Sequence, residues 1–159
     1  MNQPRPPVES LFWSIALPGL GQFLNGKYVK AIVLLALELM INSGSRLNLA
    51  IMFSFQGDLE AAARHVDYQW LLFYPCVYVF SVWDAYRDAG GGLAPYAAFP
   101  FVFCAFVTTV GIMYSSKLRL FGVLLGPVWL PMLFAAVGVG VGFAVKFAAA
   151  AWYNRVRGV

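Results

Sequence analysis

The sequence predicts an all-α fold: a polytopic helical membrane protein with about four full spans and one or two short broken or re-entrant helices. Composition is the first reason, because 61% of the 159 residues are hydrophobic and 11% are charged, whereas soluble domains are about 25% charged. Segment length is the second, because several apolar runs approach the roughly 20 residues that cross a bilayer core about 30 Å thick. We expect a single transmembrane domain over residues 10–153, with short cytoplasmic tails at residues 1–9 and 154–159.

The first apolar segment, residues 10–24, is shorter than a full span and contains Pro18, Gly19 and Gly21. Proline removes a backbone donor and glycine loosens the chain, so an uninterrupted helix is disfavoured. We expect either a short kinked span or a re-entrant half-helix that returns to the side from which it entered.

A turn is predicted directly after this segment, at Asn25 and Gly26, before the next helix. Successive backbone N–H groups near a helix start can also bind an anion, and Lys27 and Lys30 add positive charge beside the turn. We favour the structural interpretation, in which the glycines and the proline allow a tight reversal of the chain.

The second segment, residues 28–41, carries a carboxylate, Glu38, inside an apolar run. An ionised carboxylate in hydrocarbon costs at least a few kcal/mol, so Glu38 must face protein or water, be protonated, or have a partner. On one continuous helix, Glu38, Asn42 and Arg46 would lie at i, i+4 and i+8 and form a polar ridge. We favour a ridge that holds helices together over one that lines a proton or ion pathway.

The longest polar stretch is residues 56–67, which read QGDLEAAARHVD and are expected to form a surface helix or loop on the non-cytoplasmic side. The third apolar segment, residues 68–83, leads into WDAYRDAGGG. The glycines after this segment are typical of a helix end.

Two acids at the end of that helix oppose its macrodipole and therefore require compensation. Arg87 follows Asp84 at i+3 and is expected to pair with it. We also expect Asp84 to contact the turn at residues 25–30, either directly or through the Tyr28 hydroxyl.

The fourth segment covers residues 95–114, and the last apolar block, residues 118–153, is too long for one straight span. Its glycines and prolines predict a short arm over residues 120–131 and a full helix over residues 132–152. Two broken segments in one chain are also typical of an inverted repeat around a midplane site, which we keep as an alternative.

Glycines in the last block form two small-xxx-small pairs, Gly122 with Gly126 and Gly138 with Gly142. Such pairs let helices approach closely. We expect them to pack helices within the chain, and a seam between copies of the chain is the alternative.

The positions of lysine and arginine predict the topology, since these residues concentrate on the cytoplasmic side. If the first segment spans fully, the two sides carry nearly equal numbers. If it is re-entrant, six residues fall on the side of both termini, which is then cytoplasmic. Those six are Arg5, Lys27, Lys30, Arg87, Arg155 and Arg157, against Arg64, Lys117 and Arg119 on the other side.

A sequence motif carries a resemblance. The run from Pro18 to Tyr28 reads PGLGQFLNGKY and precedes an apolar helix. It resembles the opening of a group of small multi-pass bacterial membrane proteins, common in Gram-positive, Bacillus-type bacteria, and is distantly similar to the TM2 domain. In that domain a second helix ends near an acid, which Asp84 matches, although here the glycine spacing is shorter and about twenty additional residues separate the helices. The resemblance implies a multi-pass fold and no particular activity.

Catalytic and metal-site patterns are missing from the sequence. His65 is the single histidine, and Cys76 and Cys104 lie in apolar segments without the spacing of a metal site. We therefore expect no enzyme, cofactor or metal, and no nucleic-acid partner, because the basic residues occur singly at segment ends. The expected partners are the bilayer and a second membrane protein or second copy. The expected role is structural, accessory or assembly, and transport of a proton, ion or small solute past Glu38 is the alternative.

Overall fold

Helices dominate the computed structural model, which describes residues 6–157. About 76% of the chain is helical, so the predicted all-α class is confirmed. The helices are α1 (Pro7–Ala16), α2 (Leu20–Leu24), α3 (Tyr28–Ser45), α4 (Leu47–Phe55), α5 (Leu59–His65), α6 (Tyr68–Leu71), α7 (Tyr74–Asp88), α8 (Phe99–Tyr114) and α9 (Gly126–Arg157). Between α8 and α9, the strands β1 (Arg119–Leu120) and β2 (Val123–Leu124) form a small antiparallel hairpin.

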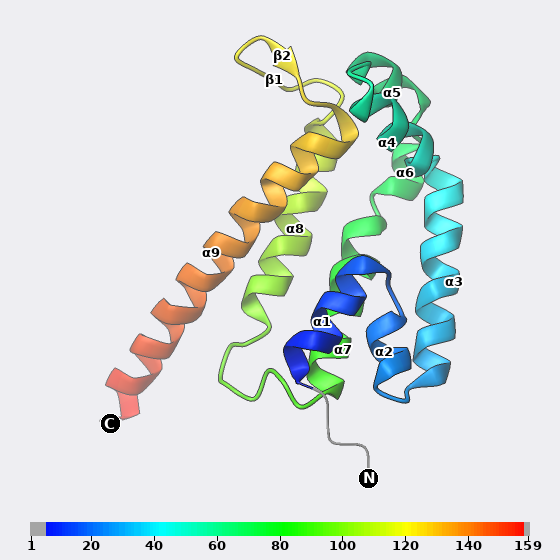
Figure 1. Cartoon of the computed structure of the whole chain (residues 1–159). Coiled ribbons are helices and arrows are strands. Elements are labelled where there is room, and N and C mark those ends of the chain that lie inside the picture. The colour runs from blue at the N-terminus through cyan, green and yellow to red at the C-terminus, as the bar shows by residue number, and fades with distance from the viewer. Residues whose placement is uncertain (1–5, 158–159) are drawn as a thin grey trace.

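Helices α3, α8 and α9 run along the length of the molecule, and α7 continues from α6 toward the end where α1 begins (Figure 1). The short helices α4, α5 and α6 and the β-hairpin gather at one end. The first helix begins, and the last one ends, at the opposite end. Helices α1 and α2 occupy the half of the molecule nearest to that second end, beside α7 and α3.

The first apolar segment folds as a hairpin. Helix α1 rises part of the way along the molecule, and α2 returns to the end from which α1 started (Figure 1). The reversal uses Gly19, whose φ of 97° lies in the left-handed region that favours glycine. This path matches the re-entrant alternative, and its first helix begins at Pro7, inside the stretch expected as a tail. The rest of that expected tail, residues 1–5, lies outside the described residues, as do residues 158 and 159.

Within the described part of the chain, two helices are long and apolar enough to cross a membrane: α3 over Tyr28–Ser45 and α9 over Gly126–Val156. Helix α8 is strongly apolar but has 16 residues, and α7 has 15. At 1.5 Å per residue these two are about 24 and 22 Å long. The polar stretch at residues 56–67 contains α5, a short helix capped by Asp58, as expected.

Two segment predictions are wrong. The third apolar segment is divided into α6 and α7 by a break at Leu72 and Phe73. The predicted arm over residues 120–131 is replaced by the β-hairpin and the first turns of α9, which continues through Pro131. Phe121 and Gly122 both have positive φ, as a tight two-residue hairpin turn requires. Pro131 removes one backbone donor from the second turn of this helix.

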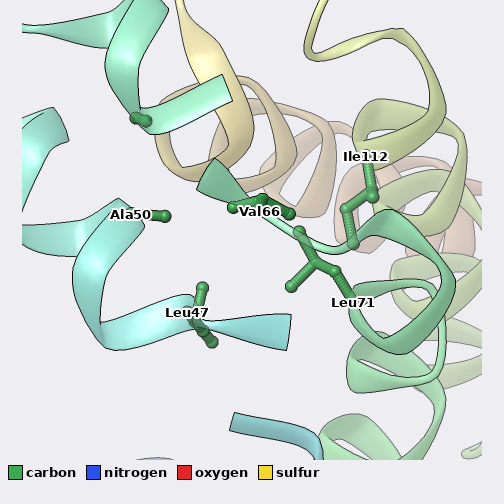
Figure 2. Close-up of a cluster of buried hydrophobic side chains, with 6 residues drawn as sticks. Leu47, Ala50, Val66, Leu71 and Ile112 are labelled. Atoms are coloured by element: carbon green, nitrogen blue, oxygen red, sulfur yellow. The ribbon is translucent and has the colours of Figure 1, made fainter. Parts of the chain in front are cut away.

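The hydrophobic core lies where α4, α5, α6 and α8 meet. Figure 2 shows Val66, Leu71 and Ile112 converging there. The full set of buried residues is Leu47, Ala50, Ala62, Val66, Leu71 and Ile112. This core joins the short helices to one end of α8, and so connects the two halves of the chain.

Glycines form a second packing region, between α8 and α9. A Cβ on Gly138 would lie 2.6 Å from the Phe103 carbonyl oxygen, and one on Gly142 would collide with Pro100. This pair therefore packs helices within the chain, as expected. The prediction for the other pair is wrong, because Gly122 lies in the hairpin turn and Gly126 is the first residue of α9.

Candidate functional site

Four buried polar side chains lie where the α1–α2 hairpin meets α7. Ser10 and Ser14, one turn apart on α1, have no exposed surface, and neither have Gln22 of α2 and Ser81 of α7. Buried polar groups are costly unless they form hydrogen bonds. Ser10 Oγ donates to Asn25 Oδ1 at 2.8 Å, and Ser14 Oγ lies 3.4 Å from Gln22 Oε1.

The amide of Gln22 connects the hairpin to α7. Its Nε2 donates to the Ser81 carbonyl oxygen at 2.8 Å and to Asp84 Oδ2 at 3.1 Å. The Gly19 backbone N–H donates to Ser81 Oγ at 3.2 Å. Because this N–H already has a partner, the structural interpretation of the glycine-rich turn is supported over the anion-binding one.

Close contact between backbones makes this region compact. A Cβ on Gly21 would collide with Ser10 and Ser14 and would lie 2.7 Å from the Ala85 Cβ. Asn25 Nδ2 then donates to the Ala85 carbonyl oxygen at 2.9 Å. Buried Pro18 fills the tip of the hairpin. The side of α7 that carries Ala85 is thus covered by α2 and the turn after it.

An ion-pair cluster closes the base of the hairpin. Lys30 Nζ lies 2.8 Å from Asp84 Oδ1 and 2.8 Å from Asp88 Oδ2. The expected contact between Asp84 and the segment at residues 25–30 is therefore present, through Lys30. We name the three residues Lys30, Asp84 and Asp88 the charge clamp.

Other residues predicted for this site lie outside the charge clamp. The predicted pairing of Arg87 with Asp84 is wrong, because Arg87 is exposed and the ion pair of Asp84 is with Lys30. The Tyr28 ring is exposed and packs against Phe23. Lys27 and Gly26 are exposed at the turn that precedes α3.

Glu38 is buried on α3, with 6% of its surface exposed. Its carboxyl group faces the Tyr74 side chain of α7. Tyr78, whose ring stacks on that of Tyr74, also lies within electrostatic range of Glu38. The Tyr78 hydroxyl donates to the Ile15 carbonyl oxygen near the end of α1. Glu38 thus joins a polar connection between α3, α7 and the hairpin tip.

The predicted polar ridge on α3 is wrong at Arg46, whereas Glu38 and Asn42 both lie on the helix. Asn42 Nδ2 donates to Asn48 Oδ1 at 3.2 Å, away from the carboxylate. Arg46 is exposed and ends α3 in a left-handed conformation, with φ of 56°, so the helical spacing does not reach it. The three residues therefore have separate roles. Glu38 lies inside the bundle, Asn42 contacts the start of α4, and Arg46 ends α3 where the chain turns.

Metal and thiol chemistry gain no support from this geometry. Across residues 6–157, no group of three or more His, Cys, Asp or Glu side chains is placed to hold a metal ion. Cys76 is exposed on α7, Cys104 is half-buried on α8, and both are free thiols.

Sequence reasoning missed Ser10, Ser14, Tyr74 and Tyr78 as members of these polar connections. The serines had a detectable signal, because they are spaced four residues apart in an apolar helix. Comparison of the chain with models of protein families, with curated proteins and with solved structures gives no match.

Proposed function

We propose that the chain is a small multi-pass protein of the cell membrane with a structural, accessory or assembly role, which packs with itself or with another membrane protein. The distribution of polarity carries this proposal. Buried polar groups bond with one another around the hairpin, whereas large apolar side chains cover the outside of the helices. Among those exposed by more than half are Ile32, Leu39, Met40, Phe106, Met132, Val137 and Phe147.

Such a surface is unsuited to water, because soluble monomers rarely expose large contiguous apolar patches. Lipid tails or the helices of a partner would cover it without cost. Helices α7 and α8 run beside the two long apolar helices, which supports four spans (Figure 1). Helix α7 alone is shorter than a full span, but α6 directly precedes it in the chain, so we count the two helices together as one span.

The proposed orientation has both termini in the cytoplasm. The end where α1 begins and α9 ends also holds the start of α3 and the end of α7 (Figure 1), and these segments carry Lys27, Lys30, Arg87 and Arg155. The opposite end holds α5 and the β-hairpin, and its segments carry Arg64, Lys117 and Arg119. Arg5 lies outside the described residues, and Arg157 is described only through its backbone. The positive-inside rule supports this orientation.

Membrane insertion is tested with the full chain. We expect it to stay in the membrane fraction after alkaline carbonate extraction. Single cysteines at residues 58 and 121, in a background in which both native cysteines are replaced, should react with an impermeant maleimide from outside intact cells. Labelling only after the cells are opened would reverse the orientation, and extraction by carbonate would overturn the membrane proposal.

The accessory role is tested by gentle purification from native membranes, followed by mass determination in detergent. We expect a stoichiometric partner or an oligomer of the chain. A monomer without a partner that conducts solute in liposomes would contradict this role.

Transport past Glu38 is a second candidate, favoured by the burial of this carboxyl group among Tyr74 and Tyr78. Acids inside a bundle are typical of proton and ion pathways. In a transporter, Glu38→Gln would abolish proton-coupled activity and leave the protein abundant. In a packing protein, the same change would lower abundance without affecting any flux.

A further inference from the structure

A groove of about 560 Å³ runs along the outside of the bundle between α3 and α7. Its walls are apolar and include Val33, Leu37, Val77 and Phe80. Val33 and Phe80 expose 51% and 57% of their surface, so the groove opens outward. Its volume lies within the range of known ligand sites, about 300–1,000 Å³.

Charged groups occur at one end of this groove only. Lys30, the third residue of α3, and Asp84, one turn before the end of α7, line it where these helices meet the base of the hairpin. Leu37 lies seven residues further along α3, about 10 Å deeper at the helical rise. In the proposed membrane orientation, the charged end faces the headgroups and the apolar part faces the acyl chains.

The charged end contains both signs. An ammonium group has three donors, and Lys30 directs two of them to Asp84 and Asp88, which leaves one for a ligand. Its side chain is 46% exposed, so this donor is accessible. The charge clamp thus places one ammonium group between two carboxylates at this end of the groove.

We propose that this groove binds one acyl chain of a phospholipid whose head group carries both a phosphate and a primary ammonium. The inference rests on the proposed membrane location. The phosphate accepts from the remaining Lys30 donor, and the lipid ammonium donates to the carboxylates of Asp84 and Asp88. Charge-assisted hydrogen bonds of this kind are stronger than neutral ones.

The mixture of charges also explains which lipids bind less well. A purely anionic head group would meet two carboxylates beside the single lysine. A choline head group has the positive charge but no N–H donor for a carboxylate oxygen. Phosphatidylethanolamine has a phosphate that can accept from Lys30 and an ammonium group that can donate to the two carboxylates.

The test uses the full chain in nanodiscs that contain equal amounts of phosphatidylethanolamine, phosphatidylcholine and phosphatidylglycerol. After extraction in mild detergent, native mass spectrometry counts the retained lipid. Val33→Trp fills the groove, and Ile32→Trp adds the same bulk at the neighbouring exposed position, which is outside the groove lining. Both positions are exposed, so both variants are expected to fold.

We expect one retained phosphatidylethanolamine, enriched about tenfold over each competitor, which corresponds to a difference of about 1.4 kcal/mol in binding free energy. Val33→Trp should remove this retention, and Ile32→Trp should preserve it. Equal retention of the three lipids, a preference for phosphatidylglycerol, or equal loss in both variants would overturn the proposal. A chain that inserts in membranes but retains no lipid contradicts only this inference, whereas a chain that fails to insert contradicts the proposed function as well.

Discussion

Gln22 and Asp84 lie 62 residues apart in the chain, and the Gln22 side-chain amide donates to the Asp84 carboxylate at 3.1 Å. The same amide nitrogen reaches the Ser81 carbonyl oxygen at 2.8 Å. One uncharged side chain of a five-residue helix therefore connects α2 to both the backbone and the acid of α7.

Replacing this amide should destabilise the hairpin. Gln22→Leu keeps the size of the side chain but leaves Asp84 and the Ser14 hydroxyl each without one partner. We expect a loss of about 1–3 kcal/mol in the free energy of unfolding, as for other buried polar groups left unsatisfied. Denaturant titration in detergent measures this. Gln69→Leu, at an exposed position of α6, is the matched control, and an equal loss in both variants would contradict the prediction.

The charge clamp should be more sensitive to Lys30 than to its neighbour Lys27. Lys30→Met leaves two carboxylates facing each other without their ammonium, whereas Lys27 is exposed and forms no ion pair with the described residues. We expect a loss of about 1–2 kcal/mol for Lys30→Met, reduced by the solvent exposure of the ammonium, and little change for Lys27→Met.

High salt separates the two causes of such a loss. Screening by salt should reduce the difference in free energy of unfolding between wild type and Lys30→Met, because the clamp is partly exposed. A difference that is independent of salt would show that the lysine acts through its aliphatic stem.

The glycines of α9 offer a comparison within one helix. A Cβ on Gly138 would lie 2.6 Å from the Phe103 carbonyl oxygen, whereas a Cβ on Gly140 would meet nothing within 4 Å. Gly138→Ala should destabilise the protein by about 1–3 kcal/mol through overpacking. Gly140→Ala should be neutral or stabilising by up to about 1 kcal/mol. If thermal unfolding in detergent ranks these variants the other way, Gly138 does not pack closely against Phe103 of α8.

Tyr78 is expected to hold the tip of the hairpin, because its hydroxyl donates to the Ile15 carbonyl oxygen. Tyr78→Phe removes only that hydroxyl. Backbone amides near the end of α1 should then exchange with deuterium about tenfold faster, which corresponds to a hydrogen bond of roughly 1.4 kcal/mol. Tyr114→Phe, at an exposed position of α8, should leave this exchange unchanged. Faster exchange spread evenly over the whole chain would indicate a global loss of stability instead.

The sequence was sufficient to predict that the first apolar segment is broken, but it left open whether this segment is a kinked span or a hairpin. Gly19 lies at a reversal with positive φ, and the acid near the end of α7 needed compensation from a cation. Local rules of turn chemistry and helix dipoles led to both conclusions. They could not choose between Arg87 and Lys30, because that choice depends on how closely α3 approaches α7.

Other features depend on contacts that a linear sequence does not display. Phe121 adopts a positive φ that is uncommon for an aromatic residue, so the β-hairpin has only Gly122 as a signal. Arg46 ends α3 because the chain must turn toward the core around Leu71, although its neighbours are compatible with a longer helix. The partners of Glu38 are likewise selected by tertiary packing.

The distance along the chain between the hairpin and α7 has a consequence for biosynthesis. Ser81 is synthesised 59 residues after Gln22, which at about 5–20 residues per second is a delay of roughly 3–12 s. During that interval the Gly19 backbone N–H and the Gln22 side-chain amide lack their partners on α7, and each unsatisfied group in hydrocarbon costs several kcal/mol. In the proposed membrane location, we expect the nascent hairpin to stay in the hydrated headgroup region until α7 has been made, so that the first part of the protein to be synthesised is among the last to reach its final depth.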